Sequence, residues 1–83
     1  MRSDAGSPVQ MRVAFRYGKA GRIRTYGLRA DGRQIELWVQ AESAGSLRSR
    51  KLVTCADEAD VEPFLRDVER ELREGGWSSS PGR

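Results

Sequence analysis

The sequence contains no histidine and only one cysteine, Cys55, among its 83 residues. Without histidine, the chain lacks the commonest general base and the commonest metal ligand of proteins. Its Cys, Asp and Glu residues do not fall at metal-ligand spacing, and the sequence has neither a phosphate-binding loop nor a nucleophile elbow. We therefore expect no enzyme activity, no bound metal and no cofactor.

Long apolar segments are also missing. No run approaches the roughly 20 apolar residues of a membrane span, and no apolar stretch follows Arg2 near the N-terminus, so we expect no signal peptide and no membrane partner. A single cysteine cannot form an internal disulfide, which favours a cytoplasmic protein. The length predicts one small domain whose core is a single contact between two layers.

Charge is abundant but unevenly placed along the chain. Residues 1–55 contain 11 Arg or Lys and 4 Asp or Glu, whereas residues 56–83 contain 4 Arg and 8 Asp or Glu. The net charge is +3. This division indicates either two surfaces with different roles or two solvated faces that attract each other.

Alternation of apolar and polar residues predicts four β-strands, at 9–17, 22–30, 33–42 and 47–56. We expect a four-residue loop at Gly18–Gly21 and a two-residue turn at Asp31–Gly32. Ser43–Ser46 is expected to be a flexible loop. The domain is predicted to span residues 9–77, between disordered tails at 1–8 and 78–83.

After the fourth strand the apolar period becomes helical. Asp60 is the predicted N-cap, because this start places Pro63 in the first turn, where its missing N–H breaks no helical hydrogen bond. Gly75 and Gly76 are expected to end the helix. The apolar stripe of the helix consists of Val61, Phe64, Leu65, Val68 and Leu72.

The two turns predict a register for the sheet. The Asp31–Gly32 turn pairs Ala30 with Arg33, and the four-residue loop pairs Tyr17 with Arg22. The helix is expected to cover the apolar face that results, because nothing else in the chain can. The predicted fold is α+β, a four-stranded antiparallel meander followed by one C-terminal helix packed on one face (ββββα). The residues that both registers place on the covered face are Met11, Val13, Tyr26, Leu28, Ile35 and Leu37.

The other face of the predicted sheet is open and carries Trp38. In this register Trp38 lies opposite Thr25, with Ile23 and Gly27 as diagonal neighbours. Basic residues surround it, and the register of the fourth strand decides which of its residues join them. The basic residues are Arg12, Arg16 and Arg29, with either Arg48 and Arg50 or Lys51 from the fourth strand.

An aromatic side chain among arginines predicts binding of nucleic acid, single- or double-stranded. Bases stack on aromatic side chains, and guanidinium groups hold phosphates. One alternative is a protein partner or a homodimer, formed through the same face or an edge strand. Another is purely structural, with the indole covering the gap left by Gly27. The predicted nucleic-acid-binding residues are Arg12, Arg16, Arg29, Trp38, Arg48, Arg50 and Lys51.

Two families resemble parts of this pattern. Residues 50–77, "RKLVTCADEADVEPFLRDVERELREGGW", resemble the last strand and helix of the arm-type DNA-binding domain of phage tyrosine integrases, over about a third of the chain. In that family a three-stranded sheet enters the major groove and a helix supports it, whereas here we expect a fourth strand and no recombinase domain. The ββββα order is also similar to that of single-strand-binding transcription coactivators of the PC-four type. Both resemblances imply DNA binding and assign no site residue.

Overall fold

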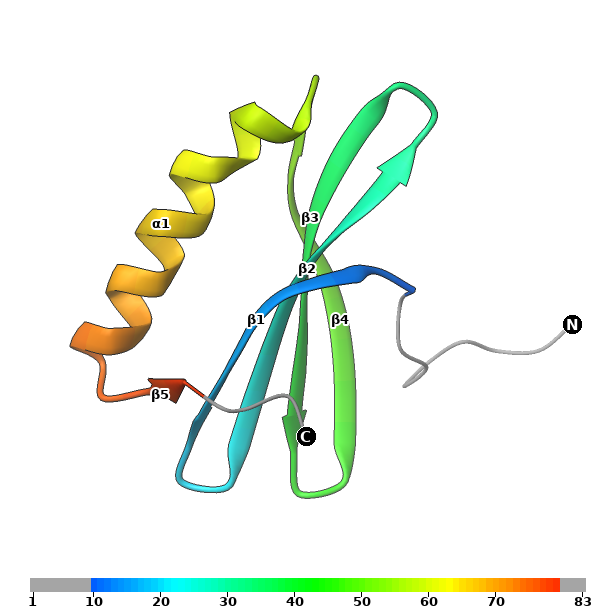
Figure 1. Cartoon of the computed structure of the whole chain (residues 1–83). Coiled ribbons are helices and arrows are strands. Elements are labelled where there is room, and N and C mark those ends of the chain that lie inside the picture. Colours follow the sequence, from blue (N-terminus) through cyan, green and yellow to red (C-terminus); the bar gives the residue numbers. More distant parts are fainter. Residues whose placement is uncertain (1–9, 80–83) are drawn as a thin grey trace, which may run out of the picture.

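The computed structural model describes residues 10–79, so the predicted tail at 1–8 and the last four residues lie outside the described part. One antiparallel sheet, in the order β4-β3-β2-β1-β5, carries one helix (Figure 1). The predicted α+β class and strand–helix order are confirmed. The elements are β1 (Arg12–Lys19), β2 (Arg22–Asp31), β3 (Gln34–Ser43), β4 (Ser46–Cys55), α1 (Glu58–Glu74) and β5 (Ser78–Ser79).

The first and third hairpin turns are tighter than predicted, and the middle turn has the predicted length but lies one residue further along the chain. Ala20 and Gly21 form the first turn, and Ala44 and Gly45 form the third, all with positive φ. Two central residues with positive φ are typical of a type I′ turn, whose twist matches that of the flanking strands. The flexible loop expected at 43–46 is therefore a two-residue turn. The middle turn, at residues 32–33, begins with Gly32 at φ 63°.

The shorter first turn and the displaced middle turn change the register of the sheet. Ala30 pairs with Ile35 instead of Arg33, and Tyr17 pairs with Arg24 instead of Arg22. Each change is a shift of two residues, and an even shift leaves a side chain on its predicted face. The central apolar residues therefore face the helix as predicted, although their cross-strand partners differ.

A β-bulge at Ala14 breaks this rule in the first half of β1. Beyond the bulge, Arg12 pairs with Leu28 on the helix side, and Val13 pairs with Gly27 on the open side. The prediction that Met11 and Val13 belong to the core is wrong. Val13 is 55% exposed, and the Met11 side chain lies against the Cα of Gly27 on the open face. One extra residue in a strand exchanges the faces of all residues beyond it.

The helix begins earlier than predicted. Asp57, not Asp60, is the N-cap, and its carboxylate accepts the backbone N–H of Asp60 at 3.2 Å. Pro63 therefore lies inside the helix, where it cannot donate to the carbonyl of Ala59. Ala59 is exposed, so water can satisfy that carbonyl. Val61, the first residue of the predicted apolar stripe, is fully buried in the core.

The core lies between α1 and the sheet in two clusters. Leu72 packs on Tyr17, Tyr26 and Val39 near the helix C-terminus, with Trp77 at the margin as predicted. Phe64, which the predicted helical stripe places in the core, is 45% exposed instead, because the apolar stripe of α1 is wider than the part of the helix that contacts the sheet. The second cluster, near the helix N-terminus, consists of Val61, Leu28 and Leu37, with Ile35, Val53, Cys55 and Leu65 packed against it.

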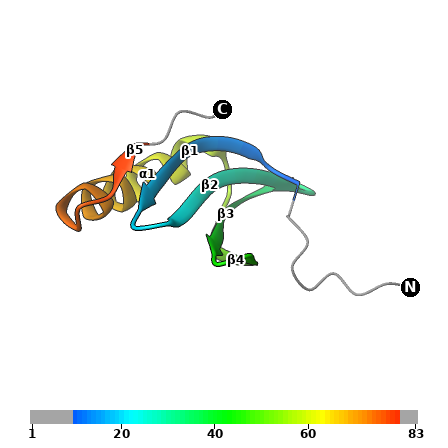
Figure 2. The same ribbon diagram turned by 90° about the horizontal axis from the view of Figure 1, so that it is seen from below.

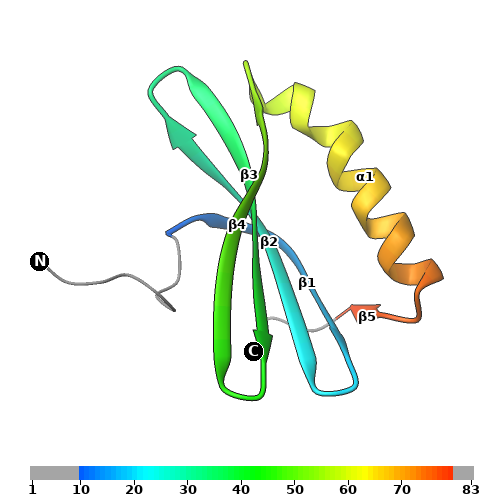
Figure 3. The same cartoon turned by 180° about the vertical axis from the view of Figure 1, so that it is seen from behind.

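The helix covers only part of its side of the sheet. The β1–β2 and β3–β4 hairpins extend past the last turn of α1, as seen from both sides in Figures 1 and 3. Viewed from below, the sheet curls from β1 to β4 (Figure 2). The N-terminal half of α1 packs over β3 and β4, and its C-terminal half lies beside β1, where Glu69 and Arg73 contact Tyr17. The hairpin ends of β2, β3 and β4 therefore present a helix-side surface that no helix covers.

Candidate nucleic-acid interface

The structure divides the seven predicted binding residues between the two faces of the sheet. Four of them lie on the open face, which are Arg16, Arg29, Trp38 and Lys51. Arg16 pairs with Thr25, Arg29 pairs with Glu36, and Trp38 pairs with Lys51. The bulge at Ala14 moves Arg12 to the helix side. The register of β4, which the sequence left open, also places Arg48 and Arg50 there, opposite Ala41 and Val39. The seven residues therefore do not form one surface.

The open face is balanced in charge. Among the described strand residues, the register places three basic residues there, Arg16, Arg29 and Lys51. It also places three acidic residues there, which are Asp31, Glu36 and Glu42. This balance contradicts the premise of a basic open face.

Glu36 lies at the centre of the open face and binds the residues predicted to hold a ligand. Its carboxylate accepts the Trp38 indole N–H at 2.8 Å and lies 3.5 Å from Lys51 Nζ and 3.9 Å from Arg29 Nη1. The hydrogen bond from Trp38 is the main reason that the pKa of Glu36 lies below its ordinary value. Burial opposes this shift, and the charges of Lys51 and Arg29 reinforce it. The indole is thus held in the surface by a buried carboxylate.

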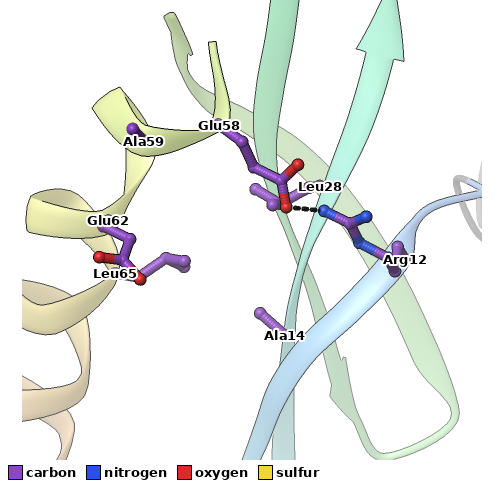
Figure 4. Close-up of a pocket in the computed structure, with 7 residues that line it drawn as sticks. All are labelled: Arg12, Ala14, Leu28, Glu58, Ala59, Glu62 and Leu65. Atoms are coloured by element: carbon purple, nitrogen blue, oxygen red, sulfur yellow. Dashed lines mark hydrogen bonds and ion pairs between the residues drawn. The ribbon is translucent and has the colours of Figure 1, made fainter.

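Arg12 closes a hollow between the bulged strand and the helix N-terminus (Figure 4). Its guanidinium pairs with the carboxylate of Glu58 across this gap. Ala14, Leu28 and Leu65 line the hollow below the pair. Arg12 therefore links β1 to α1. It pairs with Leu28, at the end of β1 opposite to the uncovered hairpin ends.

The uncovered helix-side surface is strongly basic. Three successive cross-strand rows run from β2 through β3 to β4, and small residues occupy the centre of two of them. We call the four arginines that flank β3 in these rows the arginine surface. The rows are Arg22–Ser43–Ser46, Arg24–Ala41–Arg48 and Tyr26–Val39–Arg50. In the third row Tyr26 and Val39 are buried under Leu72 of the helix, so only Arg50 of that row belongs to the uncovered surface.

Within residues 10–79, no acidic side chain forms an ion pair with Arg22, Arg24, Arg48 or Arg50. Three of the four are exposed, and the half-buried one, Arg24, lies over the Trp77 ring at 4.6 Å from its centroid. Unpaired guanidinium groups on one surface repel one another, and an anionic ligand would relieve this repulsion.

Arg22 and Arg24 were missed as candidates by sequence analysis. Alternation places Arg24 correctly on the helix side, and the helix was expected to cover that side. A helix of 17 residues is about 25 Å long, which is shorter than strands of ten residues at roughly 3.3 Å per residue. This difference in length is the signal that part of the face had to stay open.

Comparisons with family models, with curated proteins and with solved structures found no match. The part of the chain that the structure describes has no helix long and apolar enough to cross a membrane. It also has no group of three His, Cys, Asp or Glu side chains that could hold a metal ion.

Proposed function

We propose that this chain is a nucleic-acid-binding domain and that the arginine surface is its binding face. The observation that carries the proposal is the gathering of Arg22, Arg24, Arg48 and Arg50 on one side of the sheet, with no acidic partner among residues 10–79. Guanidinium groups bind phosphate through paired hydrogen bonds as well as through charge. The proposal moves the site from the face of Trp38, where Glu36 already pairs with Arg29 and Lys51.

The floor between the arginines also supports a phosphate ligand. Ala41, Ser43 and Ser46 are small and exposed, so a phosphodiester chain can approach the sheet closely. The serine hydroxyls can donate to phosphate oxygens. The surface thus combines cations at its sides with small donors at its centre.

A protein partner fits this surface less well. Protein interfaces depend on large apolar or aromatic anchors at their centre. Among residues 10–79 the exposed large apolar side chains are Val13, Leu52 and Phe64, and none of them belongs to the three rows of the arginine surface. A homodimer through the β4 edge would bring Arg48, Arg50 and Lys51 of two copies together. Like charges on an edge strand disfavour that pairing.

Three double variants that each remove two positive charges test the proposal. Arg48→Gln/Arg50→Gln alters the arginine surface, Arg29→Gln/Lys51→Gln alters the open face, and Arg66→Gln/Arg70→Gln alters the outside of α1. Binding of fluorescent DNA and RNA oligonucleotides, single-stranded and duplex, is measured by anisotropy between about 50 and 200 mM salt, over which phosphate binding weakens steeply.

We expect only Arg48→Gln/Arg50→Gln to weaken binding strongly and to reduce the slope of log affinity against log salt by about 1.5. Equal losses in all three variants would mean attraction by net charge without a site. A loss confined to Arg29→Gln/Lys51→Gln would return the site to the face of Trp38. Absence of binding by the parent chain at low salt would overturn the proposed function.

A further inference from the structure

The ligand class can be narrowed from the shape of the arginine surface and the residue at its edge. We propose that this surface binds a single strand of nucleic acid along β3, with an unpaired base stacked at the Arg24–Trp77 pair. This inference rests on the proposed function and makes it more specific.

The arginines stand in two lines on either side of one strand. Arg22 and Arg24 lie on β2, Arg48 and Arg50 lie on β4, and β3 runs between them. Neighbouring strands are about 4.8 Å apart, so the two lines are separated by roughly 10 Å between Cα atoms. Long guanidinium side chains from both lines can reach a single phosphodiester chain above β3. The direction of that chain is therefore set by the strand beneath it.

The edge of the surface offers a place for a base. The Arg24 guanidinium lies over the ring of Trp77, and Trp77 is half-buried against the core cluster of Leu72 and Tyr26. Indole rings and guanidinium planes are the groups on which unpaired bases stack in proteins that bind single strands. In a duplex the base faces are already stacked on one another, so only an unpaired base can use this site.

Arg24 therefore has two roles, since its charge attracts phosphate and its planar guanidinium stacks on a base. Substitution by lysine removes only the second role. Lysine keeps the positive charge but has no planar group to stack. Arg24→Lys should weaken single-strand binding about fivefold or more, because base stacking contributes strongly to such affinity. Arg22→Lys is the matched control, since Arg22 lies one row away on the same strand and has no described contact with Trp77. It should change affinity about twofold or less.

The experiment compares single-stranded DNA with a blunt duplex that carries the same number of phosphates, using the parent chain, Arg24→Lys and Arg22→Lys. The parent should prefer the single strand, and Arg24→Lys should lose that preference while binding duplex as Arg22→Lys does. Each titration is repeated in a Trp38→Phe background, where Trp77 is the only tryptophan. Its fluorescence should change on binding single strands and not on binding duplex.

Two results separate this inference from the proposed function. If duplex and single strand bind equally and Arg24→Lys acts on both as Arg22→Lys does, the arginine surface binds nucleic acid but the single-strand inference is wrong. An unchanged Trp77 signal at saturating single strand would overturn the stacking role. If neither oligonucleotide binds, the proposed function itself fails.

Discussion

Gly27 on β2 lies directly opposite Trp38 on β3, at the centre of the open face. A Cβ added to Gly27 would come within 2.7 Å of Met11 Cγ and 2.8 Å of the backbone oxygen of Arg12. The glycine therefore lets the bulged part of β1 cross close to β2, with Met11 above it. The surface around Trp38 is a packed structure of its own, although it lies on the side without a helix.

Replacing Gly27 with alanine should lower the free energy of unfolding by about 1–3 kcal/mol, because a backbone oxygen cannot move as a side chain can. Gly18→Ala is the matched control. Its added Cβ would make only an ordinary contact, 3.5 Å from the oxygen of Arg22, and alanine is less costly than glycine in a strand. Urea unfolding of both variants checks the prediction, which equal losses would contradict.

How much of this could be predicted from the sequence depends on the feature. Period-two alternation is a property of the whole strand, so the central residues Tyr26, Leu28 and Leu37 were placed on the correct face. This held even though the first and third turns are one residue shorter at each end than predicted and the middle turn is displaced by one residue. The bulge at Ala14 has no such signal, because it depends on how β1 fits over Gly27 and Met11. It moved Arg12 away from the predicted site.

The location of the arginine surface could not be predicted from the sequence, for a related reason. It depends on where α1 stops relative to the hairpin ends, and hence on the packing of Leu72 and Trp77 against Tyr17. Such packing is three-dimensional and leaves no periodic trace in the sequence. The balance of charge on the open face likewise required the register, since Glu36 is one acid among twelve in the composition.

Trp38→Ala should reduce stability by about 1–2 kcal/mol and leave nucleic-acid affinity unchanged. The half-buried indole packs on its own face and donates to Glu36, while the proposed ligand lies on the other face. Trp38→Phe should recover part of the stability, since the ring returns without its N–H. Thermal unfolding and the anisotropy titration test the two statements separately. A loss of affinity in a folded Trp38→Ala variant would contradict the second one.

Acid should destabilise the protein in part through Glu36. Because its pKa in the folded protein lies below the ordinary value of 4.5, its contribution to stability is fully present above that value and is lost as the pH falls through the lower, folded pKa. Glu36→Gln, which can still accept the Trp38 N–H, should be less stable than the parent at pH 7. Urea unfolding from pH 7 to pH 2.5 should show this difference shrinking as Glu36 becomes protonated. A constant difference at all pH values would mean that the charge of Glu36 plays no part.

The hydroxyl of Tyr17 joins β1 to the C-terminal half of α1. It donates to Glu69 Oε2 at 2.7 Å and accepts from Arg73 Nε at 3.2 Å, and Tyr17 itself is buried. Tyr17→Phe should cost about 1–2 kcal/mol of stability, because two hydrogen bonds to charged groups are lost. Tyr26→Phe is the control, since Tyr26 is also buried but its hydroxyl has no recorded hydrogen bond among residues 10–79, and its loss should stay within about 0.5 kcal/mol. Similar losses in both variants would show that the hydroxyl bonds of Tyr17 contribute little.

The two Ala-Gly turns offer a way to stabilise the fold. Ala20 and Ala44 both have φ of 52°, a left-handed conformation that is unfavourable for alanine and well tolerated by asparagine. Ala20→Asn and Ala44→Asn should each raise the free energy of unfolding by about 0.5–1 kcal/mol, and their effects should add because the turns belong to different hairpins. Ala30→Asn is the control, because Ala30 is an exposed strand residue without positive φ and asparagine is disfavoured in strands. Urea unfolding should therefore show gains at both turns and none at Ala30. A loss of stability at either turn would mean that the contacts of the alanine methyl group stabilise the fold more than the better backbone conformation of asparagine does.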